Sequence, residues 1–144
     1  MNTESKSLIL HQYDFSNFAE KARLMMGFKG LAWRAVEIPP IAPKPKLTPL
    51  TGGYRRTPVL QDGADVWCDT KLIARQLERR VPQPTFYPPN TSGMADAVAW
   101  WAEQQFMRPT ALYVSGINAD YMPEGLHADR AKLHGLPMPS IEAV

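Results

Sequence analysis

The chain has 144 residues, of which 44% are hydrophobic, so it can form one domain of ordinary size or one small domain and part of another. Its formal net charge is +2, its basic residues form no long run, and no apolar run reaches the length of a membrane span, which argues against nucleic-acid binding and membrane insertion. The single cysteine excludes an internal disulfide framework, and the scattered histidines show no metal-ligand spacing, so we expect a cytoplasmic protein without a metal site.

The first forty residues predict a β-α-β unit. Residues 1–10 do not resemble a signal peptide, and residues 7–13 are a short apolar run that predicts a buried strand. Ser16 is a good N-cap for a helix that ends near Gly30, and residues 31–38 alternate as a second strand. The apolar residues that recur at helical spacing are Phe18, Ala22, Met25 and Met26. This unit is long enough for a parallel strand pair with a right-handed crossover.

Residues 39–53 interrupt this regular pattern. Five prolines and two glycines exclude a regular helix there and predict an irregular surface segment with one short helical turn. Pro58 then stands near the start of an apolar run, and a proline cannot donate a ladder hydrogen bond. Either that strand lies at a sheet edge or the proline serves another purpose.

A hairpin and a helix follow. Asp62-Gly63 separates two short runs, residues 57–61 and 65–67, and is a strong hairpin signal. Asp69 or Thr70 caps the next helix. One face of that helix is expected to carry Leu72, Ile73, Gln76 and Leu77. Because a parallel strand pair comes first and an antiparallel hairpin second, we expect a mixed sheet.

The last third of the chain is typical of a linker followed by helices. Residues 81–93 are rich in proline, serine and threonine and predict a linker between domains. Residues 94–114 have a helical pattern that Pro109 is expected to kink or end. Residues 125–136 predict one more helix.

The expected long helix carries more apolar surface than it can bury. Trp100 and Trp101 are typical of core or domain-interface residues rather than of side chains that stack on a substrate. One helix with two apolar faces needs further protein to cover them. We therefore expect the chain to be a fragment of a longer protein or, failing that, to need a partner chain.

Residues 54–78, YRRTPVLQDGADVWCDTKLIARQLE, carry a family resemblance. They contain an X-Pro pair at a strand (Thr57-Pro58), a hairpin, an acidic-hydroxyl pair that opens a helix (Asp69-Thr70) and Ile-Ala-x-x-Leu within that helix (Ile73 to Leu77). In this order and spacing they resemble the N-terminal domain of the glutathione S-transferase family. The resemblance extends from about Leu8 to Pro88.

The resemblance implies a fold class and a division into domains. It implies an α/β fold, a thioredoxin-like β-α-β-loop-β-β-α domain with a mixed four-stranded sheet, followed by a partial all-α domain. The expected bounds are residues 1–82 for the glutathione-binding domain, 83–93 for the linker and 94–144 for the incomplete helical domain. Family members have a longer second domain that supplies the electrophile pocket and half of a dimer interface, so a homodimer is implied.

The resemblance also implies how glutathione binds as a co-substrate. Pro58 is expected in the cis form at the start of an internal strand, and Val59, next to Thr57-Pro58, is expected to offer its backbone N–H and C=O to the cysteinyl part. Asp69 is expected to face the ammonium group of the γ-glutamyl end, and Thr70 to hold its carboxylate. The alternative for this pair is a plain N-cap.

Three basic residues have two interpretations each. Arg56 matches a family position that reaches the glycyl carboxylate or the backbone of glutathione, and Lys44 and Lys46 could do similar work. The alternative for all three is a solvated surface charge.

Ser16 is the thiol-activating residue that the resemblance implies. Residues 16–23, SNFAEKAR, match the Ser-x-x-x-x-x-[Val/Ala]-Arg pattern of members whose serine hydroxyl hydrogen-bonds the glutathione sulfur, although Asn17 replaces the usual proline. Tyr13 is the second candidate donor, and a plain cap is the alternative for Ser16. The absence of a cysteine here argues against a redox cycle, and Cys68 is typical of a buried small residue.

Two functions follow from the resemblance. The first is a glutathione transferase, in which the thiolate of bound glutathione attacks a small electrophile and Ser16 stabilises the anion. The second is a non-catalytic binding or protein-interaction module that kept the fold. Ser16 and Asp69-Thr70 favour the first, whereas the proline-rich segment and the short helical part favour the second. The electrophile, the class within the family and the choice between Ser16 and Tyr13 stay open.

Overall fold

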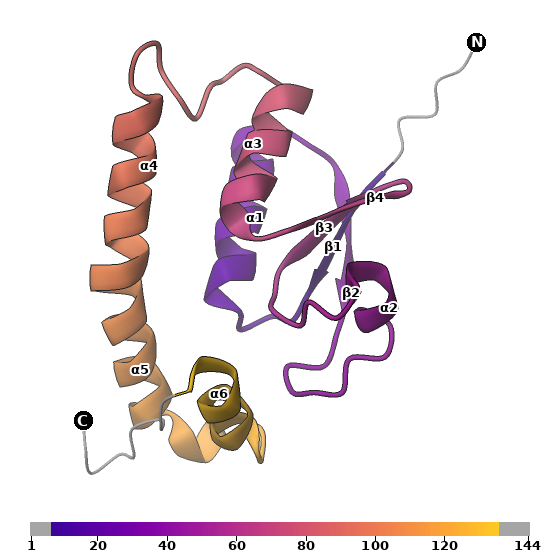
Figure 1. The fold of residues 1–144 in the computed structure, drawn as a ribbon, viewed down its shortest axis with the longest axis vertical. Helices are drawn as coiled ribbons and strands as arrows, with labels where there is room; N and C mark the ends of the chain where they lie inside the picture. Colours follow the sequence, from indigo (N-terminus) through magenta and orange to yellow (C-terminus); the bar gives the residue numbers. More distant parts are fainter. Residues whose placement is uncertain (1–6, 136–144) are drawn as a thin grey trace. The chain divides into compact units, whose positions relative to one another are not determined.

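The structure describes residues 7–135, and the chain divides into two compact units. The computed structural model assigns Met1–Phe86 to the first unit and Tyr87–Val144 to the second. The six N-terminal residues and the last nine residues of the expected helical domain, 136–144, lie outside the described part. Figure 1 gives the course of the chain and the labels of its helices and strands.

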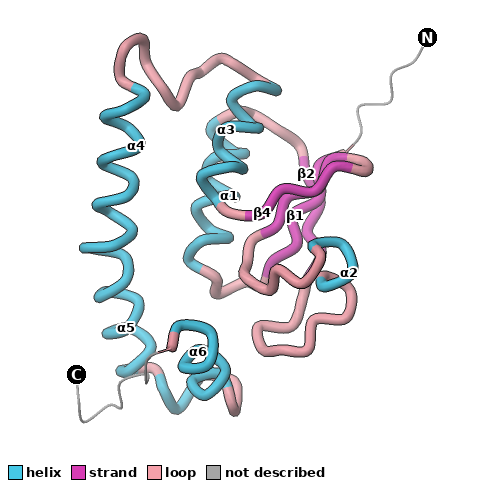
Figure 2. The backbone as a smooth tube through the Cα atoms, viewed as in Figure 1, coloured by secondary structure: helices cyan, strands magenta, loops and turns pink. Residues whose placement is uncertain are grey.

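The first unit is a four-stranded sheet with three helices. Its elements are β1 (Leu8–Gln12), α1 (Asn17–Phe28), β2 (Trp33–Glu37), α2 (Thr48–Thr51), β3 (Val59–Asp62), β4 (Asp65–Cys68) and α3 (Thr70–Arg80). The strand order is β2-β1-β3-β4, in which β1 and β2 are parallel and the other two pairs are antiparallel. The expected mixed sheet and thioredoxin-like α/β fold are confirmed. Figure 2 shows α1 and α3 on one side of the sheet and α2 on the other.

The position of β3 answers the question raised by Pro58. The strand lies between β1 and β4, so it is not an edge strand. Pro58 stands immediately before the strand begins at Val59, where a missing N–H leaves the ladder intact. The peptide bond between Thr57 and Pro58 is cis, as are the Ala42–Pro43 and Gln83–Pro84 bonds.

Apolar side chains pack on both faces of the sheet. The core on the face covered by α1 and α3 contains Leu8, Leu10, Ala22, Met26, Leu60, Ile73 and Leu77. On the other face the buried apolar residues are Ile38, Leu47 and Val59. Each fully buried leucine or isoleucine stabilises the fold by about 1.5–3 kcal/mol relative to an exposed one. This packing holds the strands that carry the candidate site.

Two of the core positions expected on the helices are wrong. Phe18 is 37% exposed and Leu72 is 44% exposed. The buried stripes instead run through Ala19, Ala22 and Met26 on α1 and through Thr70, Ile73, Ala74 and Leu77 on α3. Helical spacing predicts that a stripe exists, but the direction in which it points is decided by the packing of each helix on the sheet.

Local signals end most elements where the sequence predicts. Ser16 is the N-cap of α1, and Gly30 adopts a φ of 62° directly after the C-cap residue Lys29. Gly63, with a φ of 64°, lies in the two-residue loop that joins β3 to β4. The helical turn expected in the proline-rich segment is α2. These capping and turn predictions are confirmed.

A partly buried ion pair attaches residues 84–86 to the rest of the first unit. The Lys29 ammonium is fully buried and donates to Glu78 Oε2 at 2.5 Å and to the Pro84 carbonyl at 2.6 Å. The Phe86 N–H donates to the same carboxylate at 3.0 Å, and the Phe86 ring lies 4.3 Å from the ammonium. Composition is typical of a linker here, but tertiary contacts hold these residues on the sheet domain.

The surroundings of the Glu78 carboxylate stabilise its ionised form. Burial by itself raises its pKa, but hydrogen bonds from Lys29, the Phe86 N–H and the Thr85 hydroxyl, with the charge of Lys29, bring the pKa below its ordinary value. Protonation of Glu78 therefore weakens the attachment of residues 84–86.

The second unit is helical. Its elements are α4 (Ser92–Trp101), the π-helical segment η1 (Ala102–Met107), α5 (Arg108–Ile117), the 3-10 turn η2 (Ala119–Tyr121) and α6 (Leu126–His134), and α6 confirms the predicted last helix. Pro109 does not end the long helix. It is the second residue of α5, separated by one residue from the π-helical segment, whose changed hydrogen-bond register accommodates a residue without an N–H.

The two tryptophans of α4 are not core residues. Trp100 is 62% exposed and Trp101 is 56% exposed, so burial in a core is excluded in the described part of the chain, and a place in a domain interface stays a prediction. In the described part of the second unit, the helices after α4 do not cover these side chains. None of the helices between residues 7 and 135 combines the length and the apolar character needed to cross a membrane.

Candidate functional site

Strand register brings three loops to one end of the sheet. His11 of β1 pairs with Val59 of β3, and Val59 pairs with Cys68 of β4. Because β1 and β4 run toward this end and β3 runs away from it, the loops after β1 and β4 meet the loop before β3. Val59, these loops and the first residue of α3 together supply all the predicted site residues: Tyr13, Ser16, Arg56, Thr57, Pro58, Val59, Asp69 and Thr70.

Ser16 caps the first helix at this end. Its Oγ accepts a hydrogen bond from the Ala19 N–H at 3.2 Å, and its own N–H donates to the Tyr13 carbonyl at 3.1 Å. A hydroxyl both donates and accepts, and the Oγ only accepts in this contact, so its proton can be donated to a ligand. Helix capping and thiol activation are therefore compatible roles for Ser16.

Tyr13 lies directly after β1 and packs against the core of the α2 face. Its ring centroid lies 4.8 Å from that of Phe15 and 5.4 Å from the Lys44 ammonium. The ring also borders the cluster that contains Leu47 and Val59. These contacts fix the ring at the base of the loop that leads to Ser16.

Asp69 and Thr70 open the third helix beside the same strand ends. Asp69 has a φ of 75° and a ψ of 131°, an unfavourable conformation for a residue with a side chain, and its Oδ1 accepts from the Lys71 N–H at 2.8 Å. Thr70 is buried as the first residue of α3. The N-termini of α1 and α3 both lie at this end, so their unpaired N–H groups and partial positive charge favour an anion there.

The expected role of Val59 as a backbone partner of glutathione does not fit the structure. Val59 is fully buried and is paired with His11 on one side and Cys68 on the other, so its N–H and C=O lie within the ladder. Thr57 lies outside the ladder and is half-buried. Across residues 7–135, no hydrogen bond to the backbone N–H or C=O of Thr57 is found. Thr57 is therefore the residue whose backbone can pair with a ligand.

The basic residues divide into one buried and two exposed side chains. Lys44 is only 3% exposed, and its ammonium donates to Thr57 Oγ1 at 3.2 Å. The interpretation of Lys44 as a solvated charge is wrong, because the proline-rich segment folds back against the loop that carries Thr57. Lys46 and Arg56 are exposed.

Arg56 and Asp69 both influence the pKa of Tyr54. Burial raises the pKa of the Tyr54 hydroxyl, Asp69 and Cys68 raise it further, and Arg56 lowers it. Burial, followed by the charge of Asp69, also raises the pKa of the Cys68 thiol. The charges of Arg56 and Asp69 therefore both act on the Tyr54 hydroxyl. The raised pKa of Cys68 is typical of a packing residue rather than of a nucleophile.

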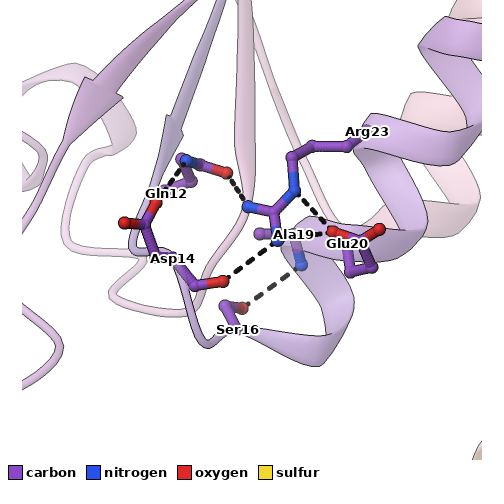
Figure 3. Close-up of polar contacts among 6 residues, drawn as sticks. All are labelled: Gln12, Asp14, Ser16, Ala19, Glu20 and Arg23. Carbon is purple, nitrogen blue, oxygen red and sulfur yellow. Dashed lines mark hydrogen bonds and ion pairs between the residues drawn. The ribbon is translucent and has the colours of Figure 1, made fainter.

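Sequence reasoning missed two features of this end of the sheet. One is the burial of Lys44, for which prolines on either side gave no sign. The other is a polar cluster behind the first loop, in which Arg23 of α1 contacts Gln12, Asp14 and Glu20 (Figure 3). The arginine that ends the Ser-x-x-x-x-x-[Val/Ala]-Arg pattern was the one available signal for this cluster.

The site can bind an extended, peptide-like anion. The Thr57 backbone offers the donor and acceptor of a β-type pair, and the helix N-termini and Lys44 offer positive charge. The Ser16 hydroxyl can donate to a thiolate within this positive environment. Among the residues that the structure describes, no three histidine, cysteine, aspartate or glutamate side chains come together as a metal site.

Comparison with known proteins identifies a family for the first unit and solved structures that match most of the chain. The profile described as "Glutathione S-transferase, N-terminal domain" matches residues 10–85. Among solved structures, a GST-like protein from Pseudomonas syringae is 52% identical, with a TM-score of 0.65, and the match covers 82% of this chain and 41% of that chain. The search of curated proteins finds no match.

Two further solved structures contain glutathione. A glutathione transferase homologue from Burkholderia is 26% identical, with a TM-score of 0.59, over 71% of this chain and 59% of that chain. Rice GST1 is also 26% identical, with a TM-score of 0.60, over 90% of this chain and 59% of that chain. The chain thus spans between 41% and 59% of the length of these three proteins.

Proposed function

Because this chain belongs to the glutathione S-transferase family, we propose that it binds glutathione at the described end of the sheet and conjugates the glutathione thiolate to small electrophiles. The observation that carries this proposal is the convergence of Ser16, Thr57 and Asp69-Thr70 through the register of β1, β3 and β4. The two glutathione-containing relatives support it, because the matches cover 71% and 90% of this chain.

Each part of glutathione has a counterpart in the site. The cysteinyl backbone pairs with the N–H and C=O of Thr57, ahead of Pro58. The γ-glutamyl carboxylate binds the hydroxyl and N–H of Thr70 at the start of α3, and its ammonium group faces Asp69. Arg56 is exposed, its charge acts on Tyr54 together with that of Asp69, and its guanidinium pairs with the glycyl carboxylate.

The Ser16 hydroxyl activates the glutathione sulfur. It donates a hydrogen bond to the sulfur, which favours the thiolate, and the released proton passes to solvent. The sulfur lone pair then forms a bond to the electrophilic carbon of the second substrate, and the electron pair of the broken bond leaves with the leaving group. Tyr13 is the alternative donor, from the same loop.

The whole protein is proposed to act as a cytoplasmic homodimer. Exposed apolar side chains on the second unit support a partner chain, since Trp100, Trp101 and Phe106 are each more than half exposed. The same surface also supports the second candidate, a glutathione-binding interaction module without turnover. The two candidates differ in one property, the ionisation of the bound thiol.

Titration of bound glutathione tests the proposal. The thiolate absorbs in the ultraviolet, so its formation can be followed against pH with the protein saturated by glutathione. We expect the thiol pKa to fall below that of free glutathione, and conjugation to an activated aryl halide to follow the thiolate fraction. S-methylglutathione, which offers the same carboxylate, amino and backbone groups but has a sulfur that cannot ionise, is the control for binding by calorimetry. Binding with an unchanged thiol pKa and no conjugation would establish the interaction module instead.

A further inference from the structure

Arg23 holds the loop between β1 and α1 by contacts on three sides. Its guanidinium donates to Gln12 Oε1 on β1, to the Asp14 backbone carbonyl at 3.0 Å and to Glu20 Oε2 at 2.6 Å (Figure 3). Gln12 in turn donates from Nε2 to the Asp14 carboxylate at 3.4 Å. The strand, the loop and the helix are therefore joined through one side chain.

The Gln12 contact of this cluster is partly buried, whereas the contacts with the Asp14 carbonyl and with Glu20 are exposed. The Gln12 residue is 4% exposed, and the Arg23 side chain is 22% exposed. Only the Glu20 contact, with a carboxylate that is half exposed, resembles an ion pair between neighbouring turns of a helix, which contributes little. The Gln12 and Asp14 contacts join Arg23 to residues that lie 11 and 9 positions away in the sequence. They therefore fix the backbone of the loop and not the helix alone.

The loop held in this way carries both candidate thiol donors. It consists of residues 13–15 and leads into Ser16, whose N–H donates back to the Tyr13 carbonyl at 3.1 Å. Asp14 and Phe15 are exposed, so apolar packing alone does not fix this turn. The position of the Ser16 hydroxyl relative to the thiol therefore depends on the Asp14 carbonyl, which Arg23 binds.

We propose that Arg23 is a positioning residue for thiol activation, which holds the loop so that the Ser16 hydroxyl meets the glutathione sulfur. This proposal rests on the proposed function. Arg23 lies behind the loop, contacts protein groups and acts through Ser16. A planar guanidinium suits the task because one rigid group reaches three acceptors in fixed directions, which a lysine ammonium does not.

The Arg23→Lys variant tests the geometry of the guanidinium contacts separately from the positive charge of this side chain. The variant keeps the positive charge, so any rise in the thiol pKa of bound glutathione comes from lost positioning. We expect that pKa to rise by about 1 and the conjugation rate at neutral pH to fall about tenfold, since small misplacements of catalytic groups have effects of this order or larger. Binding of S-methylglutathione should be unchanged, because Thr57 and Asp69-Thr70 do not contact Arg23.

Two further variants test the route of the effect. In a Ser16→Ala background, Arg23→Lys should cause no additional rise in the thiol pKa, because a residue that acts through Ser16 has nothing left to position. Glu20→Gln is the matched control, since it removes the exposed ion pair and keeps the Gln12 and Asp14 contacts. Its thiol pKa should equal that of the wild type.

The outcomes distinguish this proposal from the function on which it rests. A wild-type protein that does not lower the thiol pKa refutes thiol activation and, with it, the role of Arg23. A normal thiol pKa in Arg23→Lys, or an additional loss in the double variant, overturns the role of Arg23 alone. If Arg23→Lys does not fold, the Gln12→Met variant tests the proposal instead, because it removes the Gln12 contacts and leaves Arg23 in place. A raised thiol pKa in Gln12→Met supports the proposal, and a wild-type value overturns it.

Discussion

Replacing Ser16 by alanine and by glycine separates its structural role from its proposed chemical role. Both variants remove the Oγ that accepts the Ala19 N–H at 3.2 Å. Loss of an N-cap serine costs about 1 kcal/mol of unfolding free energy when alanine replaces it, but only a few tenths when glycine does. Stability should therefore fall in Ser16→Ala and change little in Ser16→Gly.

The proposed chemical role predicts equal losses in the two variants. A hydrogen bond to a charged group contributes about 1.5–3 kcal/mol. One pKa unit corresponds to about 1.4 kcal/mol, so losing this bond should raise the thiol pKa of bound glutathione by about 1 to 2. Conjugation at neutral pH should fall about 10- to 100-fold, the order expected for removal of one anion-stabilising donor. The loss should shrink at high pH, where the thiol ionises without help.

The assay is the conjugation rate against pH, together with the ultraviolet titration of bound thiol and urea unfolding. Ser92→Ala removes an exposed serine hydroxyl from the second unit and serves as the control. Rates that follow stability, with Ser16→Ala slower than Ser16→Gly, would refute a chemical role for the hydroxyl. Equal pH profiles in all the variants would leave Ser16 as a helix cap and move the search to Tyr13→Phe.

Three further predictions follow from the same end of the sheet and from the attachment of residues 84–86. Thr70→Val should weaken glutathione binding by about 1–3 kcal/mol because the bound carboxylate loses a donor, and an unchanged affinity in calorimetry would reduce Thr70 to a structural residue. In NMR spectra, glutathione should shift the Thr57 amide signal, while the Val59 amide stays protected from exchange by its ladder; a shift confined to Val59 would reverse this assignment. Glu78→Gln should lower the free energy of unfolding by about 1–3 kcal/mol at neutral pH. Because the folded-state pKa of Glu78 lies below its ordinary value of 4.5, this difference should be present above pH 4.5 and disappear as the pH falls through the lowered pKa, and a difference that persists in acid would contradict the role of the carboxylate.

Much of the fold could be predicted from short stretches of sequence. Ser16, Gly30, the Asp62-Gly63 turn and Asp69 mark the ends of elements, and the structure places caps or turns at each of them. These features depend on backbone geometry and on hydrogen bonds that span a few residues, so the information lies within the stretch itself. The order of the elements then indicates a parallel pair followed by an antiparallel hairpin, and hence a mixed sheet.

The candidate site needed the tertiary structure because its contacts join distant residues. Lys44 contacts Thr57, and Arg23 contacts Gln12 and the Asp14 carbonyl, which no local pattern relates to one another. The sequence determined which residues can cap, turn or donate. The packing of the chain decided which of them are buried, which face the site and which backbone groups stay unpaired, because burial and ladder pairing are set by neighbours far away along the chain.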